Sequence, residues 1–160
     1  MTGKRGLPYK VRLSGADCFH LVLDKHAKKH GAGGNVMRKV FFFNSRIDHK
    51  KIGQVLKRSD VINWLCNIRL RTPLFRIPYW QYTAGGKEIV LTQHDEPDEK
   101  QIPRSILERD ITIKASRFVE ADIIYYPSGN SAFILSWNHI LLDAKGTVLL
   151  FDHLNQLTEN

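Results

Sequence analysis

The chain has 160 residues and a formal net charge of +8, a size at which one domain buries a sufficient core without disulfides or a metal. Its 42% hydrophobic and 25% charged residues exclude a disordered or fibrous protein. The two cysteines, Cys18 and Cys66, lie far apart in no CxxC spacing, which excludes a disulfide framework and fits a reducing compartment. No apolar run approaches the ~18 residues of a membrane span and the first residues hold no apolar leader. We therefore expect a single domain over 1–160 in a cytoplasmic protein.

The N-terminal region is predicted to form a helix and then a strand. Ser14 followed by Asp17 resembles a capping box, so a helix is expected to begin there and to close near Gly31. The small residues at 32–34 predict a flexible break. The β-branched and aromatic residues of 35–44 then predict a strand.

The middle of the chain is predicted to hold two helices and a pair of strands. Apolar residues at helical spacing over 45–71 indicate two helices that are interrupted near Ser59 and ended by Pro73. The stretches 75–83 and 87–94 are typical of strands, and the glycines between them favour a hairpin.

The C-terminal third contains the strongest secondary-structure pattern. Pro103 is expected to open a short helix that runs through Glu108. Two apolar runs within 120–139 flank the turn sequence PSGNS and predict a hairpin. Residues 147–157 have the spacing of a terminal helix. Interspersed strands and helices predict an α/β (α+β) fold: a two-layer sandwich with a mixed sheet and helices packed on it.

His139 and Asp143 are the candidate site residues, at the mouth of the apolar run FILSWNHILLDAKG. A turn between a strand and a helix can present side chains to a cleft from rigid elements. The imidazole of His139 can take a proton from an alcohol, amine or thiol as that group attacks a carbonyl. Asp143 can orient the imidazole, pair with an arginine to brace the turn, or simply begin the helix.

The stretch AFILSWNHILLDAKG resembles the HHxxxDG motif of the coenzyme-A-dependent acyltransferase superfamily, which includes chloramphenicol acetyltransferase, condensation domains and wax ester synthase/diacylglycerol acyltransferases. RLSGADCFHLVLDKH is similar to the LSxxDxxFL opening of the wax ester synthase and condensation-like members. The order of the opening, the strand KVFFFN, the helix and the histidine motif also matches the family. The resemblance implies a role in lipid or secondary metabolism.

The resemblance implies roles for individual residues. His139 corresponds to the second histidine of the motif, the general base, and Asp143 to the aspartate that holds the loop by a salt bridge, often to an arginine. Arg69, Arg71 and Arg76 are equal candidates for that arginine. No permanently bound cofactor is implied; acyl-CoA or a phosphopantetheine thioester would be the co-substrate.

Two positions depart from the motif. Asn138 replaces the first histidine, which keeps hydrogen bonding but removes a titratable group. Ala144 replaces the glycine, and Gly146 follows two places later. Because glycine permits backbone angles and close approaches that a Cβ blocks, Ala144 is expected to alter the ligand channel.

Length is a further departure, because the family is built from two similar subdomains with the active site between them, and this chain resembles the N-terminal one. The resemblance therefore implies a partner: a C-terminal half lying elsewhere or a second subunit. The alternative is a non-catalytic binding or assembly module that retains the fold.

The positive charge lies in the first 60 residues, which hold 14 Lys or Arg against 4 Asp or Glu. Such a surface can attract coenzyme A phosphates, an acidic carrier protein or an anionic membrane surface. It can also attract nucleic acid, but no nucleic-acid-binding motif accompanies it. Cys18, His20, His26 and His30 lack the paired spacing of a zinc site, and Cys18 has no feature of a nucleophile, so no metal site is predicted.

Overall fold

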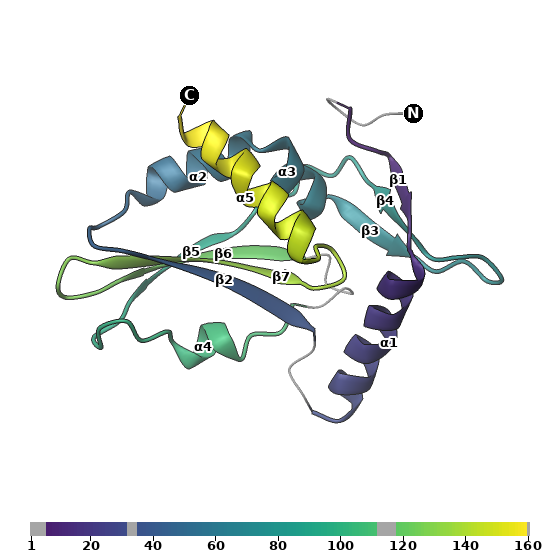
Figure 1. The fold of residues 1–160 in the computed structure, drawn as a ribbon, viewed down its shortest axis with the longest axis horizontal. Helices are drawn as coiled ribbons and strands as arrows, with labels where there is room; N and C mark the ends of the chain where they lie inside the picture. The colour runs from purple at the N-terminus through teal and green to yellow at the C-terminus, as the bar shows by residue number, and fades with distance from the viewer. Residues whose placement is uncertain (1–5, 32–34, 112–117, 160) are drawn as a thin grey trace.

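The computed structural model describes residues 6–31, 35–111 and 118–159, and a four-stranded mixed sheet is its centre. The strand order is β2-β7-β6-β5, in which β2 (Val36–Phe43), β7 (Ser131–Asn138) and β6 (Val119–Tyr125) pair antiparallel and β5 (Leu91–Asp95) pairs parallel to β6. Helices cover one face of this sheet, and a short helix lies on the other (Figure 1). The predicted mixed sheet with packed helices is therefore confirmed.

The capping residues place the first helix where the sequence predicts it. α1 (Gly15–Lys29) begins after Ser14, whose hydroxyl accepts the backbone N–H of Asp17 while the Asp17 carboxylate accepts the backbone N–H of Ser14. This reciprocal arrangement satisfies two of the otherwise unpaired N–H groups of the first turn. The strand predicted at 35–44 is β2, and the predicted break at 32–34 lies outside the described residues.

Two helices follow β2, and Ser59 separates them as predicted. α2 (His49–Arg58) ends at Ser59, and the hydroxyl of Ser59 accepts the backbone N–H of Ile62 to begin α3 (Asp60–Cys66). The expectation that α3 continues to Pro73 is wrong, because β3 (Ile68–Arg71) follows Cys66 directly. Pairing with a neighbouring strand outweighs the helical spacing of these residues.

The predicted hairpin between 75–83 and 87–94 is also wrong. β4 (Tyr79–Tyr82) lies between β1 (Lys10–Arg12) and β3 in a separate three-stranded antiparallel sheet. β5 instead joins the large sheet beside β6. Both segments are strands, but β4 pairs with β1 and with the preceding strand β3, whereas β5 pairs with β6.

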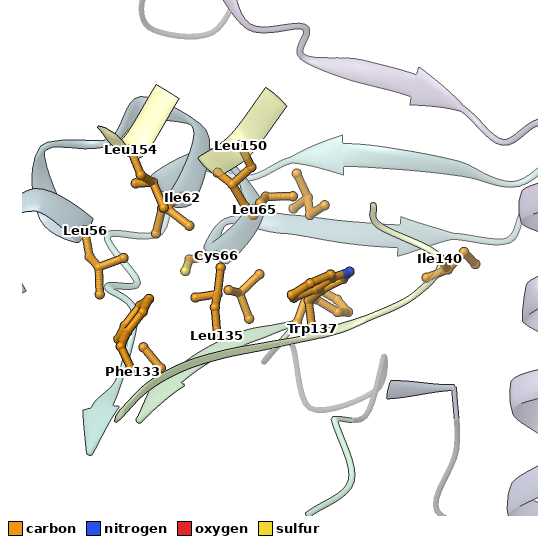
Figure 2. Close-up of a cluster of buried hydrophobic side chains, with 14 of the residues drawn as sticks. Leu56, Ile62, Leu65, Cys66, Phe133, Leu135, Trp137, Ile140, Leu150 and Leu154 are labelled. Carbon is orange, nitrogen blue, oxygen red and sulfur yellow. The ribbon is translucent and has the colours of Figure 1, made fainter. Parts of the chain in front are cut away.

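The predicted hairpin around PSGNS is confirmed and supplies the core strands. β6 and β7 pair from Val119 with Trp137 to Tyr125 with Ser131. Alternate side chains of these strands pack against α3 and α5 (Ala144–Thr158), the predicted terminal helix (Figure 2). Labelled members of this core are Leu56, Ile62, Leu65, Cys66, Phe133, Leu135, Trp137, Ile140, Leu150 and Leu154.

The opposite face of the sheet has a smaller apolar cluster. The short helix predicted after Pro103 is α4 (Arg104–Leu107), and its Ile106 packs with Ile124 and Ile134 of the sheet. None of the helices in the described ranges is long and apolar enough to cross a membrane.

Cys66 makes the stability depend on pH above the neutral range. Burial raises the pKa of its thiol from 9.0 to about 11, so between these values the unfolded chain loses a proton that the folded chain keeps. Stability conferred by the neutral thiol is therefore present below pH 9 and lost as the pH rises, by about 2 kcal/mol at pH 11. We expect urea denaturation under reducing conditions to show this decline in the wild type and its absence in Cys66→Ala.

The quantity to compare is the difference in the free energy of unfolding between wild type and Cys66→Ala at each pH, because the other titrating groups are common to both proteins. Cys18→Ala is the matched control, since Cys18 is only partly buried, and it should retain the decline. Parallel curves for wild type and Cys66→Ala between pH 8 and 11 would contradict the assignment.

Candidate active site

His139 lies in the turn that joins β7 to α5 and is partly exposed. Its backbone N–H donates to the carbonyl of Asn35 at 2.8 Å, and its Nδ1 lies 3.3 Å from the carbonyl oxygen of Leu142. A carbonyl oxygen only accepts, so the contact assigns the ring proton of the neutral imidazole to Nδ1. The lone pair is then on Nε2, which has no hydrogen-bond partner within the described residues. This is the tautomer that a general base requires.

Asn138 is a buried structural residue rather than a free polar group of the site. Its side chain is 0% exposed; Nδ2 donates to Ile111 O at 3.2 Å and to Asp24 Oδ1 at 3.3 Å. Its Oδ1 accepts the backbone N–H of Ile140 at 3.2 Å. The asparagine thus ties the end of β7 to the turn that carries His139.

Asp24 extends this network to α1. Asp24 is only 6% exposed, and its Oδ1 accepts the backbone N–H of Asn35 at 3.0 Å in addition to the bond from Asn138. Its Oδ2 accepts the ammonium of Lys28 at 2.9 Å, and Lys28 lies 3.4 Å from Asp110. The carboxylate is therefore both paired and hydrogen-bonded, as a buried charge must be.

Asp143 begins α5. Its carboxylate accepts the backbone N–H of Gly146 at 2.7 Å, which is an N-cap hydrogen bond. Among the residues that the structure describes, Asp143 forms no ion pair, and Arg69, Arg71 and Arg76 are all exposed elsewhere. The salt bridge that the resemblance implies is therefore absent from this part of the chain, and Asp143 holds the turn through the helix cap.

Ala144 does not need the backbone freedom of glycine. It is the first residue of α5, it is exposed, and its backbone has no positive φ. The close approach occurs at Gly146, where a Cβ would lie 3.2 Å from Asp143 Oδ1 and 3.3 Å from Leu142 Cδ2. Glycine at 146 therefore makes room for the capping carboxylate.

His20 is a neighbour of His139 that the sequence did not assign to this site. The two ring centroids are 4.5 Å apart with the planes inclined by 40°. Of the other residues considered as metal ligands, His26 and His30 contact each other at the C-terminal end of α1, with ring centroids 4.5 Å apart. Over the described ranges, no three His, Cys, Asp or Glu side chains gather as metal ligands.

A second polar cluster lies on the sheet face opposite α5. Arg109 contacts Glu120 at 2.9 Å and Asp122 at 2.6 Å, and Asp122 also contacts His94 at 2.8 Å. Burial acts to lower the pKa of Arg109, but the hydrogen bond and charge of Asp122, with those of Glu120, outweigh it and raise the pKa. Burial and the charge of Arg109 lower the pKa of the neighbouring Arg38. The cluster is a structural ion-pair network.

Asn138 provides a test of how the turn is held. Asn138→Ala should lower the free energy of unfolding by about 2 kcal/mol, because it leaves the N–H of Ile140 and the carbonyl of Ile111 buried without their partner. Asn138→Asp should lower it further, since it places a second carboxylate beside Asp24. Urea denaturation measures both. Asn155→Ala is the control on an exposed asparagine, and an equal effect of all three changes would contradict the network.

No protein-family model and no curated protein matches the chain. Solved structures do match. The first condensation domain of the calcium-dependent antibiotic synthetase, in complex with a substrate analogue, has a TM-score of 0.69 and 12% identity over 91% of this chain and 37% of that chain. The starter condensation domain of the rhizomide synthetase, as a mutant, has a TM-score of 0.70 and 8% identity over 94% and 37%.

A third match is the epimerization domain from the third module of tyrocidine synthetase B, with a TM-score of 0.70 and 11% identity over 94% of this chain and 34% of that chain. At these identities the likeness concerns the fold, and the chain spans little more than a third of the proteins it matches, an extent that fits an N-terminal half. The part of the fold that this chain forms is thus that of the condensation domains.

Proposed function

We propose that this chain is one subdomain of an acyltransferase that moves an acyl group from a thioester to a hydroxyl or amine acceptor. The thioester is carried by coenzyme A or by the phosphopantetheine of a carrier protein. His139 is the general base that removes the proton of the acceptor. The observation that carries the proposal is the Nδ1 contact with Leu142 O, which leaves the Nε2 lone pair of a partly exposed imidazole available at the end of a central strand.

In the proposed reaction, one proton moves from the acceptor to His139 and then to the leaving thiolate. As Nε2 takes the proton, the acceptor oxygen or nitrogen bonds to the thioester carbonyl carbon and the carbonyl π electrons move to oxygen. When the carbonyl re-forms, the C–S bond breaks and the thiolate takes the proton from His139. Asn138 and the Asp143 helix cap act as positioning residues, because they fix the turn that carries His139.

The proposal includes a second subdomain or subunit that closes the site. α1 exposes Phe19 (60%), Val22 (65%) and Leu23 (41%), which lie on one side of the helix next to His20. Apolar side chains in a row on one helix face are typical of a surface that another element covers. A companion half at this place would supply the other wall of a cleft that excludes water.

The basic residues of the first 60 positions support the choice of an anionic thioester carrier. Coenzyme A and an acidic carrier protein both bring negative charge, and long-range attraction raises their local concentration. Of the lysines in α2, Lys57 is paired with Glu88, whereas Lys50 and Lys51 are exposed. Binding through such charges should weaken as the salt concentration rises.

A non-catalytic module is the second candidate, and the burial of Asn138 favours it. Asn138, at the first position of the motif, serves packing and hydrogen bonding here. This structural role is independent of any catalytic activity. In this case coenzyme A or acyl thioesters would raise the melting temperature without forming product.

The two functions are separated by one experiment on the full chain, alone and with any subunit that co-purifies. Acetyl-CoA and an acyl-N-acetylcysteamine thioester are supplied with small alcohols and amines, and both thiol release and the acylated product are measured. Product formation that depends on His139 supports the acyltransferase. Thermal stabilisation of the wild type without product formation supports the binding module. If the wild type shows no product and no stabilisation, both candidate functions are refuted.

A further inference from the structure

His20 brings a second imidazole ring to the turn that carries His139, and Asn35 connects the two. The carbonyl of Asn35 accepts the backbone N–H of His139 at 2.8 Å, and its side-chain Nδ2 lies 3.0 Å from Nδ1 of His20. The backbone N–H of Asn35 is itself held by Asp24 Oδ1 at 3.0 Å. The same residue, anchored by a buried carboxylate, therefore positions both histidines.

The hydrogen bonds give the two rings opposite roles. The Nδ2 of an asparagine carries only donors, so His20 accepts at Nδ1 and its neutral ring has the proton on Nε2. His139 has the reverse arrangement, because its Nδ1 faces the carbonyl of Leu142. Neither Nε2 has a hydrogen-bond partner in the part of the chain that the structure describes. Two rings with centroids 4.5 Å apart thus present a donor and an acceptor side by side.

We propose that His20 is a second substrate-contacting residue, whose Nε2–H donates a hydrogen bond to the thioester carbonyl oxygen while His139 removes the acceptor's proton. This inference rests on the proposed acyl transfer. During attack, the carbonyl π electrons move to that oxygen, and a fixed donor stabilises the charge that develops there. The donor remains neutral and keeps its proton throughout, so the proton balance between acceptor, His139 and thiolate is unchanged.

The exposed apolar residues next to His20 agree with this orientation of the substrate. Phe19 precedes His20, its ring centroid 6.0 Å from that of the imidazole, and Val22 and Leu23 follow on the same helix. A carbonyl held at His20 would direct the attached acyl chain along α1, where these side chains can bury it. The substrate class that follows is a thioester with an apolar acyl group.

The first test measures the tautomers in the full chain. Long-range ¹H–¹⁵N correlation spectra of histidine-labelled protein, at a pH where the rings are neutral, should show Nε2–H for His20 and Nδ1–H for His139. Asn35→Ala should release the His20 ring to a mixture of tautomers, while His139 keeps its own because it contacts only the Asn35 backbone. An Nδ1–H tautomer for His20 in the wild type would overturn the inference.

The second test separates a donor from a ring that merely packs. His20→Phe keeps an aromatic ring beside His139 but has no donor, whereas His20→Gln keeps an N–H. With acetyl- and octanoyl-N-acetylcysteamine thioesters, kcat for thiol release should fall about 10²-fold in His20→Phe, with a smaller fall in His20→Gln and little change in KM. The preference for octanoyl over acetyl should fall in Phe19→Ser, a change on the exposed helix face.

The outcomes distinguish this inference from the proposed function. If His139→Ala is inactive while His20→Phe keeps the wild-type kcat, the donor role is wrong and the acyltransferase stands. If His139→Ala keeps the wild-type rate, the proposed function fails and the substrate role of His20 fails with it. Unchanged histidine spectra outside the site show in each case that the variant is folded.

Discussion

His139→Ala is expected to lower the rate of acyl transfer from an acyl thioester by about 10²–10⁴-fold, the usual contribution of a positioned general base. The physical reason is that no other described group near the turn can replace the base. The neighbouring His20 carries its proton on Nε2, so its Nε2 has no lone pair to accept a proton. The measurement is kcat for product formation in wild type and variant, with thiol release followed in parallel.

The fold should survive this change. His139 is partly exposed, and its backbone bond to Asn35 does not involve the side chain. His30→Ala is the matched control, because His30 is exposed at the end of α1, and it should retain full activity. A His139→Ala variant that is folded and fully active would refute a base at this position.

Arg109→Met is expected to lower the free energy of unfolding by about 3 kcal/mol, at the low end of the range for removing one partner of a buried ion pair. The change leaves Asp122, which is 0% exposed, and Glu120, which is 7% exposed, without their cation. The loss stays at the low end because His94 remains 2.8 Å from Asp122 and because water can reach the partly exposed position of Arg109. Urea denaturation at neutral pH measures it.

Arg104→Met is the control, since Arg104 is exposed on α4, only five positions earlier. It should change stability by less than about 0.5 kcal/mol. The double variant Arg109→Met with Asp122→Asn should be less destabilised than the sum of the single variants, because the two side chains interact directly. Additive losses would show that the pair contributes no interaction energy.

The sequence by itself determined the elements whose stabilising interactions are local. The capping box of Ser14 and Asp17 joins residues three positions apart, and the turn between β6 and β7 lies within one short segment. The position of His139 after an apolar strand is of the same kind, because strand, turn and helix follow one another along the chain. Short-range backbone hydrogen bonds and side-chain periodicity depend on residues that are close in sequence, so they can be predicted from the order of the residues.

Only the tertiary structure decided which distant segments meet. β4 and β5 are both strands, but whether they pair with each other depends on the surfaces of β1, β3 and β6. The bond between Asn138 and Asp24 joins residues 114 positions apart, and the contact between His20 and His139 likewise joins α1 to the far end of the sheet. Such contacts arise because burying apolar surface brings the elements together, and polar groups enclosed by that burial then require partners. No local sequence pattern predicts which residues become the partners of these buried polar groups.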